Sequence, residues 1–85
     1  MTIRIVGWNC PRTSQTLMNA QAALKEIDRR GKVEWIGDLH RIIAMGIHHT
    51  PALFVNNKLK VEGRVPSVYE ITEWAEQELV EEFIA

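Results

Sequence analysis

The sequence predicts an α/β fold with the element order β-α-β-α-β-β-α and a four-stranded mixed sheet flanked by helices. Residues 2–36 read as strand, long helix and strand, which is a βαβ unit with parallel strands. Two further strand-like segments flank Asn56 and Asn57, residues that tolerate the positive φ of a hairpin turn. Ser67, followed three residues later by Glu70, marks the start of a last helix. We therefore expect the spatial strand order 2-1-3-4, with the third strand antiparallel to the first.

Length and composition indicate one soluble domain over residues 1–85, because two domains would each be too small to fold unaided. The 46% hydrophobic content is ordinary for a globular protein. A net charge of −1 gives no bulk attraction to nucleic acid or to an anionic membrane. We expect neither as a partner.

The first residues contain no long apolar run and no small-residue cleavage site, so we expect no signal peptide. The single cysteine, Cys10, excludes an internal disulfide framework and a multi-cysteine zinc site. Both observations favour a cytoplasmic location.

The first half of the chain supplies the βαβ unit and a short helix. Residues 2–7 are rich in β-branched side chains, and residues 33–36 form a second short apolar segment. Between them, residues 12–30 predict an amphipathic helix that has Pro11 in its first turn and Arg29 and Arg30 in its last turn. Residues 39–45 predict a weaker helix. The expected buried stripe of the long helix is Leu17, Ala20, Leu24 and Ile27.

The second half supplies the hairpin and the last helix. Residues 52–55 are continuously apolar, as in a strand covered on both faces. Residues 58–62 alternate, which places Leu59 and Val61 inward and Lys58, Lys60 and Glu62 outward.

The last helix runs from the Ser67 cap to about Glu82. Its buried stripe is Val68, Ile71, Ala75 and Leu79, and its acidic residues 76–82 predict a solvated face. We expect Trp35 and Trp74 to fill the core, and Trp8 to lie either in the core or at the lip of a site.

Cys10 is the strongest candidate for chemistry. It precedes the long helix, where unpaired N–H groups and the helix dipole stabilise a thiolate, and Arg12 adds positive charge. Thr13 either donates a hydrogen bond to this thiolate or satisfies a backbone group of the first turn. The alternative for Cys10 is a small buried hydrophobic residue, which its polar neighbours disfavour.

The histidines offer a weaker signal. His48 or His49 either assists the thiol or is simply an exposed loop imidazole. We expect no metal site, because Cys10, His40 and this histidine pair would have to converge from separate segments.

Three motifs resemble the small thioredoxin- and glutaredoxin-like redox-active disulfide proteins, which share the thioredoxin fold. They are Gly-Trp-Asn-Cys-Pro-Arg-Thr at residues 7–13, His-Thr-Pro-Ala-Leu-Phe-Val at 49–55 and Lys-Val-Glu-Gly-Arg-Val-Pro-Ser at 60–67. The resemblance covers essentially the whole chain. It implies that Cys10 is the attacking thiol and that a cis Thr50–Pro51 bond faces it.

The sequence departs from that family at one position. Thr13 stands where the family's Cys-x-x-Cys motif has its second cysteine, so a dithiol cycle within this chain is impossible. The resemblance then implies a monothiol thiol–disulfide oxidoreductase with Cys10 and Thr13 at its centre and no bound cofactor.

Its partner would be a thiol or disulfide protein, or glutathione as co-substrate. Arg12, His49, Thr50 and Pro51 are the expected substrate-binding residues. The alternative is a redox-inactive module that binds a peptide or a partner protein in the same groove.

Overall fold

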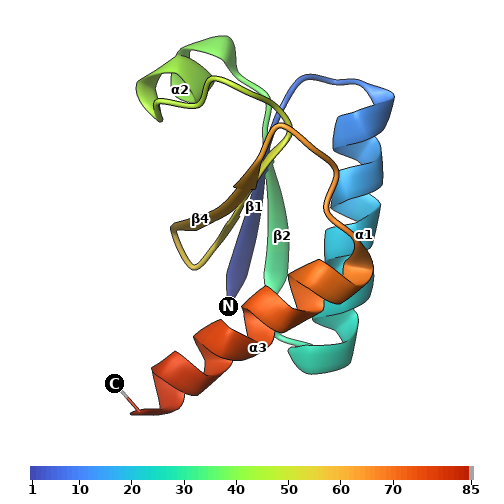
Figure 1. Cartoon of the computed structure of the whole chain (residues 1–85), viewed down its shortest axis with the longest axis vertical. Helices are drawn as coiled ribbons and strands as arrows, with labels where there is room; N and C mark the ends of the chain where they lie inside the picture. Colours follow the sequence, from blue (N-terminus) through green and yellow to red (C-terminus); the bar gives the residue numbers. More distant parts are fainter. Residues whose placement is uncertain (85) are drawn as a thin grey trace.

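The elements follow the expected order in a computed structural model that describes residues 1–84 (Figure 1). They are β1 (Thr2–Val6), α1 (Pro11–Ile27), β2 (Lys32–Ile36), α2 (Leu39–Ala44), β3 (Ala52–Val55), β4 (Lys58–Glu62) and α3 (Val68–Ile84).

The four strands form one mixed sheet in the order β2-β1-β3-β4. β1 pairs with β2 in parallel and with β3 antiparallel, and β3 pairs with β4 antiparallel. Asn56 and Asn57 form the hairpin turn with φ of 48° and 70°. The predicted α/β class and strand order are confirmed.

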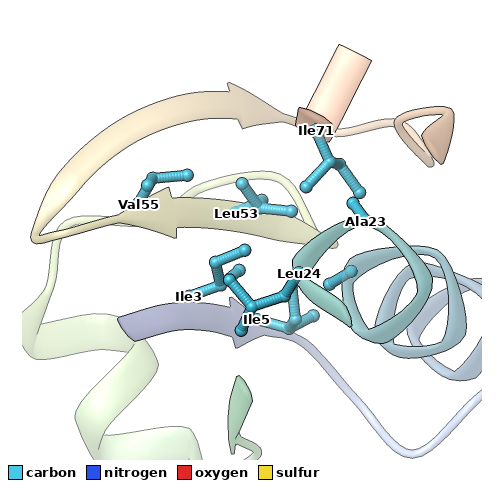
Figure 2. Close-up of a cluster of buried hydrophobic side chains, with 8 residues drawn as sticks. Ile3, Ile5, Ala23, Leu24, Leu53, Val55 and Ile71 are labelled. Carbon is cyan, nitrogen blue, oxygen red and sulfur yellow. The ribbon is translucent and has the colours of Figure 1, made fainter. Parts of the chain in front are cut away.

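The main core lies between the sheet and the pair of helices α1 and α3. Figure 2 shows side chains of β1 and β3 directed towards side chains of the two helices. This cluster contains Ile3, Ile5, Ala20, Ala23, Leu24, Leu53, Val55 and Ile71, all buried. Burial of aliphatic side chains, each worth about 1.5–3 kcal/mol, is the main force that holds these layers together.

A smaller core lies on the opposite face of the sheet, because consecutive residues of a strand point to opposite faces. It contains Val6, Ile36, Ile42, Ile47 and Ala52. The short helix α2, of six residues, supplies Ile42 to this side of the sheet. Within residues 1–84, no helix is both long enough and apolar enough to cross a membrane.

The end of α1 differs from the prediction. The helix stops at Ile27, and Asp28 follows in an extended conformation with its N–H bonded to the Leu24 carbonyl. The Asp28 carboxylate accepts the N–H of Arg30 and pairs with the N-terminal ammonium group. These side-chain contacts of Asp28 compete with continuation of the helix. Arg29 and Arg30 therefore lie beyond the helix and not in its last turn.

Strand β4 also differs, because its alternation is interrupted. The register with β3 shifts between Leu53 and Phe54, where β4 passes from Val61 to Leu59. Leu59 is therefore 46% exposed, and Lys60 is half-buried instead of outward.

The start of α3 confirms the predicted capping box. The Glu70 N–H donates to the Ser67 hydroxyl, at 3.1 Å, and the Ser67 N–H donates to the Glu70 carboxylate, at 3.0 Å. Ile71 and Ala75 are buried as expected, but Val68 is exposed and Leu79 only half-buried.

The acidic face of α3 is not uniformly solvated. Glu78 is buried, and its carboxylate pairs with Lys60 at 2.9 Å and with Lys58 at 3.2 Å. The prediction for Trp35 was also wrong: its ring is 47% exposed, with the indole N–H bonded to the Gly7 carbonyl. Trp74 packs partly buried against the main core.

Candidate thiol site

The predicted site residues come together at one end of the sheet. Val6, the last residue of β1, pairs with Ala52, the first residue of β3. Because the two strands are antiparallel, the loop that leaves β1 towards Cys10 and the Thr50–Pro51 segment that enters β3 meet at this end. Figure 1 shows the blue loop before α1, the yellow-green segment before β3 and α2 at this end.

Cys10 is the N-cap residue of α1. Its backbone is extended, with φ −147° and ψ 165°, and its carbonyl accepts the first helical bond, from the Ser14 N–H at 3.0 Å. Pro11 occupies the first helical position, where its missing N–H leaves nothing unpaired. The thiol is half-buried, which contradicts the alternative that Cys10 is a buried core residue.

Thr13 is the closest polar partner of the thiol. Its hydroxyl lies 3.5 Å from the Cys10 sulfur, and its side chain is almost completely buried one turn into the helix. The sulfur makes no regular capping bond to the backbone. The hydroxyl is therefore the group that best reaches it.

These neighbours lower the pKa of Cys10 below its usual value of 9.0. The Thr13 hydroxyl is the largest cause, followed by the Thr13 backbone N–H, and partial desolvation opposes them. The backbone N–H of Arg12 and its guanidinium charge lower the pKa less. Since a thiolate is the reactive form of cysteine, the site favours the nucleophile.

Gly7 makes the close approach of Thr13 to the sheet possible. A Cβ atom at Gly7 would lie 2.5 Å from the Thr13 hydroxyl oxygen, a distance at which one group has to move. The indole N–H of Trp35 donates a hydrogen bond to the carbonyl of the same residue, Gly7, at 2.9 Å. Trp8, two residues before Cys10 in the chain, is 46% exposed, so it lies at the surface and not in the core.

The second half of the site is the segment before β3. The Thr50–Pro51 peptide bond is cis, the geometry that the resemblance implied. The Pro51 carbonyl accepts the N–H of Gly63, at 2.9 Å, and Gly63 adopts a φ of +88° that favours glycine. The Gly63 carbonyl in turn accepts a hydrogen bond from the Arg12 guanidinium, at 2.7 Å. Gly63 thus joins the Cys10 helix to the proline segment.

Arg12 therefore has a structural contact that its sequence position did not reveal. Its guanidinium points to the Gly63 carbonyl and is exposed, so it contributes less to the thiol than Thr13 does. His48 and His49 are exposed at the rim, and Thr50 is half-buried. Within residues 1–84, no three His, Cys, Asp or Glu side chains gather into a metal-binding cluster.

Glu62 is the site residue that sequence reasoning missed. Its carboxylate accepts the backbone N–H groups of His48, at 2.9 Å, and His49, at 3.1 Å. Strand alternation predicted that Glu62 faces solvent, so this contact was not expected. The signal available in the sequence was its position next to Gly63 at the end of the strand.

Comparison with known proteins agrees with this geometry. The family model for the thioredoxin domain matches residues 1–76. The chain belongs to the thioredoxin domain family. A thioredoxin of Methanocaldococcus jannaschii is 33% identical over 73 residues, covering 86% of this chain and 84% of the relative. A thioredoxin of Methanothermobacter thermautotrophicus is 35% identical over 71 residues, covering 84% and 92%. No solved structure gives a significant match.

Within the thioredoxin family, this chain combines the fold with a single thiol. Its 85 residues contain one cysteine, and the hydroxyl of Thr13 faces that cysteine from the next turn. The described site therefore contains one cysteine sulfur atom, with the Thr13 hydroxyl 3.5 Å from it.

Proposed function

We propose that this thioredoxin-like protein is a monothiol thiol–disulfide oxidoreductase in which Cys10 is the nucleophile and glutathione is the external thiol. The observation that carries the proposal is the position of Cys10 at the start of α1 with the Thr13 hydroxyl 3.5 Å away. This arrangement lowers the pKa of the thiol, as a nucleophile requires.

The reaction takes place in two exchanges. The Cys10 thiolate attacks one sulfur of a glutathionylated protein, the protein leaves as its thiolate, and a Cys10–glutathione disulfide forms. A second glutathione thiolate then attacks this disulfide, which releases oxidised glutathione and restores Cys10. The net change is one mixed disulfide and one glutathione converted to a protein thiol and oxidised glutathione. The two electrons that reduce the mixed disulfide to two thiols are those that two glutathione molecules lose when they form oxidised glutathione.

The segment before β3 suits an extended thiol substrate. Thr50 is half-buried at the end of the sheet where the Cys10 loop lies, and we expect its backbone to pair with a substrate strand. His49, the residue before Thr50, is exposed. Such chemistry fits a reducing compartment such as the cytoplasm.

The test is a glutathione-dependent assay on a glutathionylated peptide, comparing the protein with its Cys10→Ser variant. We expect turnover that saturates with peptide and is abolished in the variant. Turnover that is equal in both proteins would exclude Cys10 as the nucleophile.

The alternative is a binding module that keeps the groove and lacks turnover. The observation in its favour is that Thr13, a residue without redox chemistry, is buried where a resolving thiol would act. Peptide binding by both proteins, with no reduction by either, would favour this module.

A further inference from the structure

Glu62 stands at the end of β4, on the strand that borders the proline segment. Its backbone pairs with Ala52, the residue directly after Pro51. Its side chain reaches past this pair to the other end of the segment, where one carboxylate oxygen accepts the N–H groups of His48 and His49. One residue therefore fixes both ends of the Thr50–Pro51 segment.

The contact has the form of an anion held by successive backbone N–H groups. Two consecutive amides that converge on one oxygen form a concave site for negative charge. Hydrogen bonds from N–H groups to a carboxylate are about twice as strong as those between neutral groups. The N–H of His48, followed by that of His49, lowers the pKa of the Glu62 carboxyl below 4.5, so the group is charged at neutral pH.

The adjacent residue extends this network to the helix that begins at the thiol. Gly63 donates its N–H to the Pro51 carbonyl and accepts a bond from Arg12, two residues after Cys10. The corner formed by Glu62 and Gly63 is thus the connection between the nucleophile's helix and the substrate-binding segment. A Cβ at Gly63 would lie 3.1 Å from that of His49, so the corner is closely packed.

From this geometry we infer that Glu62 is a positioning residue that holds the Thr50 backbone ready to pair with a peptide substrate. It does not touch the reacting sulfur atoms. The inference rests on the proposed thiol–disulfide exchange. It explains how the protein would react faster with peptide disulfides than with small disulfides. Substrates without a peptide backbone should therefore react independently of Glu62.

The experiment measures the single-exchange rate constant of reduced protein with two disulfides. One is a glutathionylated peptide, and the other is hydroxyethyl disulfide, which has no backbone to pair with Thr50. For Glu62→Ala we expect a loss of about tenfold with the peptide. With the small disulfide the rate should be unchanged, and so should the pH dependence of Cys10 alkylation.

Two further variants separate positioning from folding. Glu62→Gln keeps an oxygen acceptor without the charge, so it should recover part of the loss. Glu34→Ala removes a half-buried carboxylate on β2 that binds Arg4, and it should change neither rate. If Glu62→Ala does not fold, a selective peptide loss in Glu62→Gln supports the inference and its absence overturns it.

The outcomes distinguish this inference from the proposed function. Equal loss with both disulfides, or no loss with either, would overturn the positioning role. The same holds if the wild-type protein shows no preference for the peptide. The exchange is followed for a single step, so a failure of glutathione turnover would affect the proposed enzyme cycle alone.

Discussion

At the scale of single residues, a hydroxyl group is the main cause that lowers the pKa of the Cys10 thiol. The charge of Arg12 and the start of the helix were expected to share the work with Thr13. Instead the guanidinium is directed at a backbone carbonyl, and the Thr13 hydroxyl is the largest influence on the thiol. The sequence shows that Arg12 is close to Cys10 in the chain. It does not show that the Gly63 carbonyl, 51 residues further on, accepts a hydrogen bond from the Arg12 side chain.

Replacement of Thr13 by valine tests whether the Thr13 hydroxyl is the main cause of the lowered Cys10 pKa. The variant keeps the shape of a buried side chain and removes the hydroxyl, so the pKa of Cys10 should rise. Alkylation by iodoacetamide at neutral pH should slow by about threefold, because a smaller thiolate fraction is partly offset by higher nucleophilicity.

Measurement of the alkylation rate across pH gives the midpoint directly. Thr13→Ser, which retains the hydroxyl, is the matched control and should stay close to the wild type. A valine variant with an unchanged midpoint would show that the backbone N–H groups are sufficient.

At the scale of elements, local patterns in the sequence were good guides where local bonds decide the structure. The hairpin turn at Asn56 and the capping box at Ser67 depend on neighbours within a few residues, and both are confirmed. The faces of β4 were less predictable, because a register shift against β3 changes them and alternation alone does not reveal it. The cis Thr50–Pro51 bond followed from resemblance and not from spacing.

The start of α3 provides a titration test. The Arg64 side chain, followed by the Ser67 N–H, lowers the pKa of Glu70 from 4.5 to about 2. NMR titration of the carboxyl carbon should therefore show Glu70 charged to well below the range of ordinary carboxyls. Arg64→Gln should raise this midpoint, since it removes the largest cause, whereas Arg29→Gln should leave it in place. A Glu70 midpoint near 4.5 in the wild type would mean that the ion pair does not persist in solution.

The contact between β4 and α3 gives a prediction for stability. Glu78 is buried between Lys58 and Lys60, and the Lys60 ammonium is the main cause that lowers the pKa of its carboxyl. Glu78→Gln should therefore lower the free energy of unfolding at pH 7 by about 1 kcal/mol. Glu81→Gln, which removes only an exposed partner of Lys58, should cost less than about 0.5 kcal/mol.

The pH dependence of this effect has a defined sign. The folded-state pKa of Glu78 lies below its ordinary value of 4.5, so the charged group stabilises the fold above that value. The contribution is lost as pH falls through the lowered pKa. The difference between wild type and Glu78→Gln in urea unfolding should thus shrink below pH 4.5, and a constant difference would contradict the ion-pair explanation.

At the scale of the whole molecule, the thioredoxin-domain fold brings the Cys10 thiol to the end of the sheet at which the proline segment enters β3. Two separate parts of the chain, the loop after β1 and the segment before β3, meet at one sheet end and are joined through Gly63. This arrangement was predictable because hydrophobic periodicity determines the elements and the βαβ unit and hairpin determine their order. The hydrogen bonds of Glu62 could not be predicted, because they depend on which distant backbone groups its carboxylate reaches in the folded chain.

Introduction of a second thiol at position 13 tests whether the same site can form an internal disulfide. The Thr13 hydroxyl oxygen lies 3.5 Å from the Cys10 sulfur, and positions three apart on a helix face one another. In Thr13→Cys, the new thiol should attack a Cys10 mixed disulfide and close an internal disulfide. Oxidised glutathione should then yield a product two mass units lighter, whereas the wild type should gain one glutathione or form an intermolecular dimer. The variant should also reduce protein disulfides with a dithiol donor and without glutathione. If Thr13→Cys instead accumulates two glutathione adducts, the first turn of α1 does not bring the two sulfur atoms together, and the monothiol site is not simply a dithiol site with one side chain exchanged.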